Sequence, residues 1–286
     1  MPNRNHLSPP IFPQSWASDW GEDCYGLWMS LNYKGIICVF RWMQPGSFIM
    51  GSPIDEKGRN NNEQPHNVTL SQGFWMAETT VTQALWQAVM GDNPSKFQKG
   101  QFQKGETDNH PVEQVNWEDA HHFIDKLNAL HPALRVQLPS EAQWEYACRA
   151  GTATAFNFEG DISLKHVNYC GVWDWNTSDD WGDDAIKQTT AVKSYPCNQW
   201  GLFEMHGNVW EWCEDWYQAD LGKNAVTDPL GADTGDFRVL RGGSWIGSGR
   251  YCRSARRRRR TPSRRNGSIG FRLSLGHGAK DRTVEP

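Results

Sequence analysis

The sequence predicts a single loop-rich α+β domain, and three observations support this class. The chain has 286 residues, of which 38% are hydrophobic, so it is long enough to bury a substantial core. Its 16 Trp and 27 Gly predict a fold in which large rings fill the interior and glycines permit tight turns. Helical periodicity is confined to the first half of the chain, and short apolar pieces separated by turn residues follow position 151.

The first elements predicted along the chain are an arm, two strands and a loop. Residues 1–23 are rich in Pro and polar residues, and we expect an extended arm. The apolar runs 25–31 and 36–42 are typical of short strands. Residues 52–66 carry Gly, Asn and charges between apolar segments, so they predict a loop.

Three helices are predicted next, at residues 82–90, 117–130 and 141–150, because apolar side chains recur there with helical spacing. Polar caps and glycine stops mark their ends, at Asn116, Ser140, Gly91 and Gly151. Since no linker or internal repeat follows, we interpret residues 24–275 as one domain and 276–286 as a frayed tail.

The charge balance and the cysteine pattern exclude several kinds of protein. Charged residues make up 22% of the chain and the formal net charge is −4, a balance that favours neither nucleic acid nor a membrane. The seven cysteines are dispersed and form no CxxC pair, so they do not indicate a disulfide framework. The first residues lack the apolar core of a secretory signal, and no apolar run is long enough to span a bilayer. We therefore expect a cytoplasmic protein with mostly buried thiols.

Eight segments between residues 40 and 273 resemble, in order, the formylglycine-generating enzyme family, also called the sulfatase-modifying factor family. They are Gly46-Ser-Phe-Ile-Met-Gly-Ser, Gly73-Phe-Trp-Met-Ala-Glu-Thr-Thr-Val-Thr, Pro111-Val-Glu-Gln-Val-Asn-Trp, Leu138-Pro-Ser-Glu-Ala-Gln-Trp-Glu-Tyr-Ala, Asn198-Gln-Trp-Gly-Leu, Gly207-Asn-Val-Trp-Glu-Trp, Arg241-Gly-Gly-Ser-Trp and Gly270-Phe-Arg-Leu. The resemblance implies a C-type-lectin-like fold with little regular secondary structure, in which a few helices pack on short antiparallel sheets.

The chemistry of that family transfers only in part. Its enzymes convert a peptide cysteine to formylglycine with copper, oxygen and two cysteines placed five residues apart. Aligned on the Arg-Gly-Gly-Ser-Trp motif, the second cysteine is Cys252, but the first position holds Gly247. Copper(I) prefers soft thiolates, so one thiol does not make the site. If the protein is an enzyme, Cys252 and Ser244 are its candidate catalytic residues, copper is its cofactor, and Cys197 or Cys213 could supply the missing sulfur.

A structural calcium site is implied by the Gly-Asn-Val-Trp-Glu-Trp motif, which resembles a calcium loop of the family. Asn208 and Glu211 can each offer a side-chain oxygen, and Val209 a backbone carbonyl. The alternative is that Asn208 forms a turn and Glu211 pairs with an arginine.

Residues 246–269 are the most unusual stretch. Nine arginines and no lysine lie within residues 250–265. This arrangement resembles the variable proteins of diversity-generating retroelements, in which an error-prone reverse transcriptase randomises adenines, mostly in AAC codons, near the end of a C-type-lectin-like scaffold. Changes in the first two bases of AAC cannot produce Lys, Glu, Gln, Met or Trp, and residues 246–269 contain none of these five. The resemblance implies that Cys252-Arg-Ser-Ala, Pro262 and Gly270-Phe-Arg are fixed framework.

The leading hypothesis is a diversified ligand-binding protein whose surface segment is 246–268. The alternatives are a copper-dependent oxidase of the formylglycine type and a non-catalytic structural or partner domain. Small residues, Tyr and Arg suit adaptable contacts, and an arginine cluster favours a protein or another anionic ligand over nucleic acid. The candidate ligand-binding residues are Ile246, Ser248, Arg250, Tyr251, Arg256, Arg258, Arg259, Arg260, Ser263, Arg265, Asn266, Gly267 and Ser268.

Overall fold

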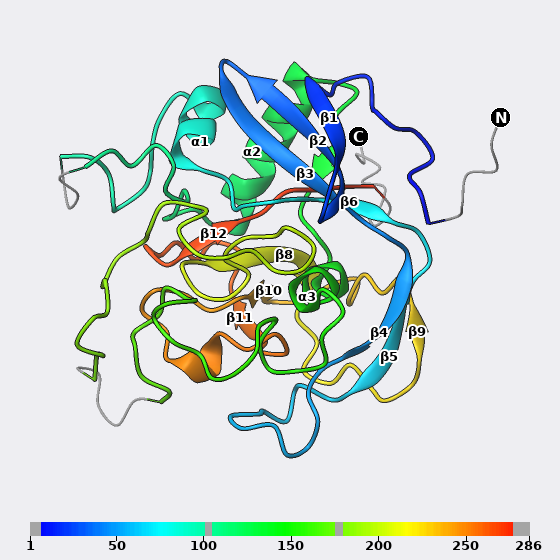
Figure 1. Cartoon of the computed structure of the whole chain (residues 1–286), viewed down its shortest axis with the longest axis vertical. Helices are drawn as coiled ribbons and strands as arrows, with labels where there is room; N and C mark the ends of the chain where they lie inside the picture. Colours follow the sequence, from blue (N-terminus) through cyan, green and yellow to red (C-terminus); the bar gives the residue numbers. More distant parts are fainter. Residues whose placement is uncertain (1–6, 101–104, 175–179, 277–286) are drawn as a thin grey trace.

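The protein is described by a computed structural model over residues 7–100, 105–174 and 180–276, in which a few short helices lie against three sheets joined by long loops (Figure 1). Apart from residue 276, the predicted tail lies outside the described residues. The combination of few helices, several small sheets and long connecting loops is that of the C-type-lectin-like fold, so the predicted fold class is confirmed.

Most of the strands belong to a six-stranded and a four-stranded sheet. The first has the order β1-β2-β3-β6-β13-β7 and the second the order β11-β10-β8-β12, while β4-β5-β9 forms a third sheet. Most neighbours are antiparallel, but β12 with β8 and β9 with β5 are parallel. The strand bounds are β1 Asp19–Asp23, β2 Gly26–Tyr33, β3 Ile36–Met43, β4 Gly46–Met50, β5 His66–Leu70, β6 Phe74–Ala77, β7 Val136–Gln137, β8 Trp210–Trp216, β9 Val226–Thr227, β10 Arg238–Arg241, β11 Arg258–Arg260, β12 Ile269–Phe271 and β13 Ser274–Gly276.

The three predicted helices are confirmed as α1 Gln83–Met90, α2 Trp117–Leu130 and α3 Glu141–Arg149. Asn116 and Ser140 each form a capping box, in which the cap side chain accepts a backbone N–H and the third helical residue bonds back. Gly91 ends α1 in the left-handed conformation. In the described part of the chain, only a short 3-10 helix, η1 Gly249–Tyr251, follows α3.

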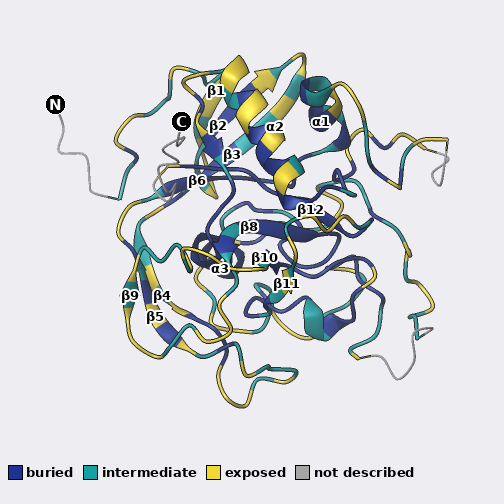
Figure 2. Ribbon diagram, turned by 180° about the vertical axis from the view of Figure 1, so that it is seen from behind, coloured by how far each residue is buried: buried dark blue, intermediate teal, exposed yellow. Residues whose placement is uncertain are grey.

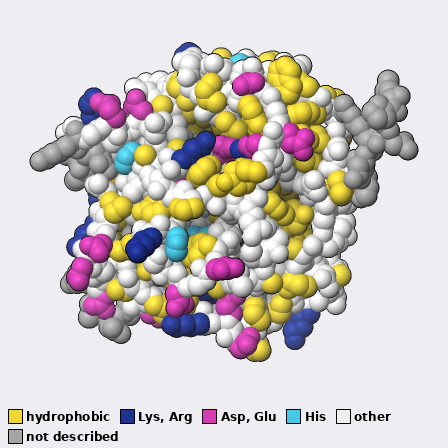
Figure 3. All heavy atoms as spheres, viewed as in Figure 1, with side chains coloured by type: hydrophobic (Ala, Val, Ile, Leu, Met, Phe, Trp, Pro, Cys, Tyr) yellow, Lys and Arg dark blue, Asp and Glu magenta, His cyan; other side chains and the backbone are white. Residues whose placement is uncertain are grey.

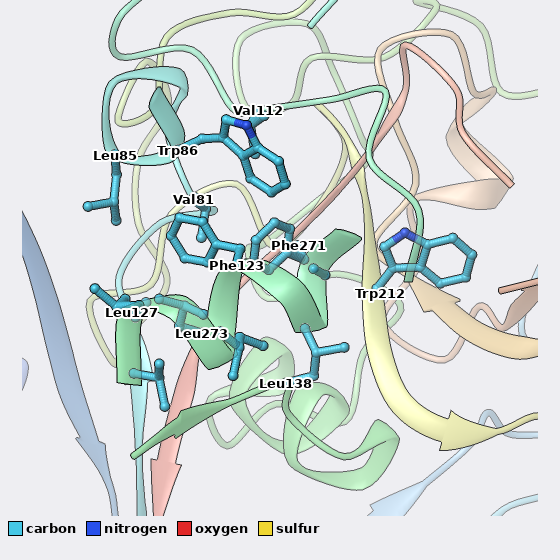
Figure 4. Close-up of a cluster of buried hydrophobic side chains, with 14 of the residues drawn as sticks. Val81, Leu85, Trp86, Val112, Phe123, Leu127, Leu138, Trp212, Phe271 and Leu273 are labelled. Carbon is cyan, nitrogen blue, oxygen red and sulfur yellow. The ribbon is translucent and has the colours of Figure 1, made fainter. Parts of the chain in front are cut away.

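Aromatic rings fill the interior, as the tryptophan content predicted. In the main cluster, drawn in Figure 4, the Trp86 ring stacks on Phe123 with centroids 5.4 Å apart, and Phe123 meets Phe271 edge-on at 5.5 Å. This cluster packs α1 and α2 against strand β12 and the end of β8. Figure 2 shows buried residues running through the centre of the molecule, with exposed residues on the outer side of α2.

The six-stranded sheet begins inside the segment that we predicted to be an extended arm. Strand β1 pairs with β2 along its whole length, from Asp19 opposite Ser30 to Asp23 opposite Gly26. Ahead of it, Phe12 stacks on Trp75, with ring centroids 5.9 Å apart. The described part of the arm is therefore packed against the domain, because its few aromatic residues find partners in the core.

The described helices include none that is both long and apolar enough to span a bilayer. On the face shown in Figure 3, basic and acidic side chains are interspersed. A group of positively charged side chains occurs instead along the arginine-rich segment.

Candidate ligand-binding pocket

The arginine-rich segment is mounted on the edge of the four-stranded sheet. Its strand β11 pairs with β10 on one side only, with Arg258 opposite Leu240 and Arg260 opposite Arg238. The segment returns to the core at β12, which pairs with β8. A rigid sheet therefore holds both ends of a surface segment, the arrangement that gives a binding site a stable base.

A pocket of about 740 Å³ opens along this segment. Among the described residues, its lining includes five arginines and no acidic residue. Eight of the thirteen predicted ligand-binding residues take part, namely Ile246, Tyr251, Arg256, Arg258, Arg259, Arg260, Asn266 and Ser268. The structure thus brings most of the predicted residues together around one cavity.

Aromatic rings flank the guanidinium groups of Arg256, Arg258 and Arg259 in the pocket. The Arg256 guanidinium lies 4.7 Å from the Tyr251 ring centre, and that of Arg258 lies 5.1 Å from Trp210. Arg259 lies 5.0 Å from the rings of Tyr217 and of Phe237. Such contacts position a cation without neutralising it, which leaves its charge available to a ligand.

The positive charge of the pocket arginines is only partly balanced by nearby carboxylates. Burial, reinforced by the neighbouring Arg260, lowers the pKa of Arg258 to about 10. Burial also lowers the pKa of Arg256, whose nearest acidic group is Glu63 at 3.9 Å, and whose buried Nε has no hydrogen-bond partner among the described residues. Burial and then Arg264 lower the pKa of Arg260. A bound anion would relieve these penalties, because it would supply the missing countercharge.

Two other arginines of the segment belong to the framework. Arg253 is fully buried and donates to Glu63 at 2.8 Å and to the Gly58 carbonyl at 2.7 Å. Arg257 is also buried, although it touches the pocket wall, and it forms a bidentate pair with Glu141 at 2.6 and 2.8 Å. Burial alone would raise the pKa of Glu141, but Arg257 outweighs it and the pKa is lowered.

The remaining five predicted ligand-binding residues do not line the pocket. Ser248 is fully buried, and Arg250 pairs with Asp174 at 2.8 Å on another part of the surface. Arg265 pairs with Asp119 at 2.6 Å, and Ser263 is exposed outside the pocket. Gly267 is buried between the pocket residues Asn266 and Ser268, and it lies close to Glu113.

Six lining residues were absent from the predicted ligand-binding residues, namely Asn62, Tyr217, Ala219, Ser244, Gly247 and Arg257. Ser244 among them is a candidate catalytic residue of the oxidase alternative. Asn62 donates to the Tyr217 hydroxyl at 2.7 Å, although 155 positions separate the two residues. No sequence pattern links such distant loops. Gly247 could have been found, because it lies between the predicted residues Ile246 and Ser248.

The site that would correspond to copper chemistry is closed. Cys252 is fully buried, and Gly243 lies so close that a Cβ there would approach the Cys252 Sγ to 2.7 Å. Burial, with Cys170 adding to it, raises the pKa of Cys252 far above its usual value, so the thiol stays protonated. Position 247 holds glycine, and the described part of the chain places no thiol in the pocket wall, so the residues present do not fit the copper site of the family.

Cys170, rather than Cys197 or Cys213, is the thiol that shares a cluster with Cys252. Both are fully buried and neither forms a disulfide. Their sulfurs face backbone carbonyls, that of Val172 at 3.8 Å and that of Ser248 at 3.9 Å. The described residues form no group of three or more His, Cys, Asp or Glu suited to a metal ion.

Glu211 does not fit the calcium role predicted for it. Both of its carboxylate oxygens accept from Arg272, at 2.9 and 3.0 Å, and one also accepts from the Trp144 indole at 2.7 Å. A calcium ion there would face the Arg272 guanidinium, which repels it. The alternative of an arginine pair describes Glu211, because the parallel pairing of β12 with β8 brings Arg272 alongside it.

Asn208 lies among neutral oxygens that suit a calcium ion better. Its Oδ1 accepts from the Asn168 amide at 3.1 Å, and its own amide donates to the Thr190 carbonyl at 3.1 Å. The Gln188 carbonyl accepts from Asn168 at 2.9 Å. Asn168 Oδ1 and Thr190 Oγ1 are buried and have no partner among the described residues. Oxygen donors of this kind fit calcium.

Comparisons with known families and proteins identify the family and the fold of the chain. A family model described as a sulfatase-modifying factor enzyme 1-like domain matches residues 39–275. The formylglycine-generating enzyme of Mus musculus is 30% identical over 236 residues, which cover 81% of this chain and 58% of the mouse protein. The chain thus spans less than two thirds of that relative's length.

Two solved structures share the fold over nearly their whole length. Treponema denticola variable protein 1 superimposes with a TM-score of 0.73 and 28% identity, covering 87% of this chain and 98% of that one. PvdO from Pseudomonas aeruginosa superimposes with a TM-score of 0.67 and 26% identity, covering 91% and 98%.

Proposed function

The chain belongs to the sulfatase-modifying factor enzyme 1-like family, and from that premise we propose that it is a ligand-binding protein rather than an oxidase. The observation that carries the proposal is the pocket along β11, whose described lining residues include five arginines and no acidic residue. The ligand is a protein segment or another molecule with carboxylate, phosphate or sulfate groups, since arginine binds such anions with paired hydrogen bonds.

Diversification of the segment is the second part of the proposal. It is supported by the absence of Lys, Glu, Gln, Met and Trp from residues 246–269 and by the likeness to Treponema denticola variable protein 1. The buried positions of Cys252, Arg253 and Arg257 agree with a fixed framework, and the pocket residues with variable contacts. The scaffold then stays constant while the residues facing the ligand change.

The direct test of binding is a titration of the whole chain with a fluorescein-labelled hexaglutamate peptide. We expect saturable binding at low ionic strength that weakens at least about tenfold when salt rises from about 0.05 M to about 0.5 M, because salt screens the arginine charges. A hexalysine peptide is the control. Equal binding of the two peptides, or affinity that ignores salt, would contradict an anion pocket.

Substitution of Cys252 distinguishes the proposed binding protein from the oxidase alternative. We expect the Cys252→Ser variant to keep the affinity for the acidic peptide within about twofold, because the thiol is buried away from the pocket. We also expect neither protein to consume a peptide thiol when supplied with copper(I) and oxygen. Oxygen-dependent loss of that thiol, abolished in the variant, would favour the oxidase.

We further propose a weak calcium site at Asn208 and Asn168. With no carboxylate placed among the ligands above, a Kd of about 1 mM is expected, so about 10 mM calcium should stabilise the fold by about 1.4 kcal/mol and raise Tm by about 3 °C. The check is thermal unfolding with calcium against magnesium. Loss of the calcium effect in Asn168→Ala would support the site, and equal effects of both ions would refute it.

A further inference from the structure

Gly267 occupies an inward-facing position in the rim of the pocket. Its neighbours Asn266 and Ser268 line the pocket, while its own carbonyl accepts from the Trp245 indole at 2.9 Å. The rim is also joined to the segment below it, because the Gln114 backbone N–H donates to the Asn266 carbonyl at 3.0 Å. Gly267 therefore lies between the ligand-facing residues and the loop that carries Glu113.

A side chain at position 267 would point directly at the Glu113 carboxylate. A Cβ built on Gly267 comes within 3.3 Å of Glu113 Oε2 and within 3.3 Å of the Lys96 side chain. The backbone of Gly267 is not in the left-handed region, so other residues can adopt its conformation without backbone strain. Glycine is thus not required here by its φ angle.

Glu113 has one satisfied and one unsatisfied oxygen. The residue is fully buried, and its Oε1 accepts from the Phe97 backbone N–H at 2.8 Å. Its Oε2 is buried and has no hydrogen-bond partner among the described residues. A buried acceptor left without a donor is costly, and more so when it is charged.

The charged group that faces Glu113 is Lys96, whose Nζ lies 5.2 Å from the Phe97 ring centre. Burial raises the pKa of Glu113 to about 7, although backbone N–H groups of Phe97 and Lys96 and the Lys96 charge oppose this. The carboxyl therefore changes its charge near neutral pH while remaining inside the fold.

We propose that Glu113 is a built-in acceptor for the side chain at position 267, so that a hydrogen-bond donor there anchors the 266–268 rim of the pocket. Position 267 then acts as an anchoring position, in contrast to its ligand-facing neighbours. Serine fits this role because its hydroxyl sits one bond beyond Cβ, within reach of Oε2. Alanine has the same Cβ and places a methyl group against that oxygen without a donor.

Gly267→Ser and Gly267→Ala form the matched pair for the test. We expect the serine variant to melt about 3 °C above the alanine variant at about pH 8, where Glu113 is ionised and accepts a charge-assisted hydrogen bond. The difference should shrink toward about pH 5, where Glu113 is protonated in the fold.

The direction of the pH effect follows from linkage. Because the folded pKa of Glu113 lies above its ordinary value of 4.5, its contribution to stability declines as pH rises from the ordinary value to about 7. A donor at position 267 lowers the folded pKa and recovers part of this loss, so its advantage grows with pH. Other titrating groups, such as Asp215, affect both variants equally and cancel in the difference.

The same pair in a Glu113→Gln background is the control. There the serine–alanine difference should no longer depend on pH, because the titrating group is gone. Equal melting of the two variants at about pH 8, or a difference of the same size at both pH values with Glu113 present, would overturn the proposal. If the Glu113→Gln protein does not fold, the pH dependence of the serine–alanine difference in the presence of Glu113 is sufficient to test the proposal. The measurement needs no ligand, so its failure would leave the proposed binding function untouched.

Discussion

Replacing Arg258 and Arg260 together with serine is expected to weaken binding of the labelled hexaglutamate peptide by at least about a hundredfold, because each charged hydrogen bond contributes about 1.5–3 kcal/mol. Both side chains line the pocket, and burial, reinforced by neighbouring arginines, lowers the pKa of each. The loss should appear mainly as faster dissociation.

The matched control is the double serine variant of Arg264 and Arg265, which removes the same charge from the same segment. Arg264 is exposed outside the pocket and Arg265 pairs with Asp119. We expect the affinity of this control for the peptide to fall less than about fivefold, because only long-range electrostatic attraction is reduced. Equal losses in the two double variants would show that binding depends on net charge and that the pocket plays no particular part.

Arg253→Ser is expected to lower the free energy of unfolding by about 3–5 kcal/mol, or about 10 °C in Tm, because it leaves buried carboxylates without a partner. Arg253 is fully buried between Glu63 and Glu56. Although burial opposes ionisation of Glu63, Arg253 outweighs it and lowers the pKa of that carboxyl. Thermal and denaturant unfolding measure the loss.

The comparison for this variant is Arg258→Ser, five positions along the same arginine run. Removing Arg258 relieves repulsion from Arg260 and breaks no ion pair with a carboxylate of the described residues. We expect its free energy of unfolding to change by less than about 1 kcal/mol. Similar destabilisation by both substitutions would mean that the arginines do not divide into framework and ligand-facing groups.

Much of the fold could be predicted because the sequence marks it locally. Asn116 and Ser140 begin helices where the apolar spacing starts, and Gly91 ends one in the left-handed conformation that glycine favours. The first strand was missed because residues 19–23 are mostly polar and lie at a sheet edge, where all of them except the half-buried Gly21 are exposed. Exposed edge strands lack the apolar alternation on which strand prediction depends.

The pocket could be predicted only in part, because its walls come from distant loops. The arginine run revealed the wall formed by residues 256–260, but Asn62 and Tyr217 reach it from loops that carry no marker. The sequence also does not show which arginines of the run are buried and which face the pocket. Arg253 and Arg258 look alike in sequence, yet one is a buried ion-pair partner and the other faces the cavity. The sequence likewise left open whether Glu211 binds calcium or pairs with an arginine, because only the fold places Arg272 beside it.

The central claim is that a fixed scaffold carries a diversified pocket, and sequencing the DNA that flanks this gene tests it most directly. We predict a near-identical copy of the segment encoding residues 246–268 beside a reverse transcriptase gene, with mismatches only at adenines of the copy. They should fall in codons of pocket residues such as Arg256, Arg258 and Asn266, and spare those of Cys252, Arg253 and Arg257. Lack of any copy, or mismatches spread equally over buried and pocket codons, would contradict the account.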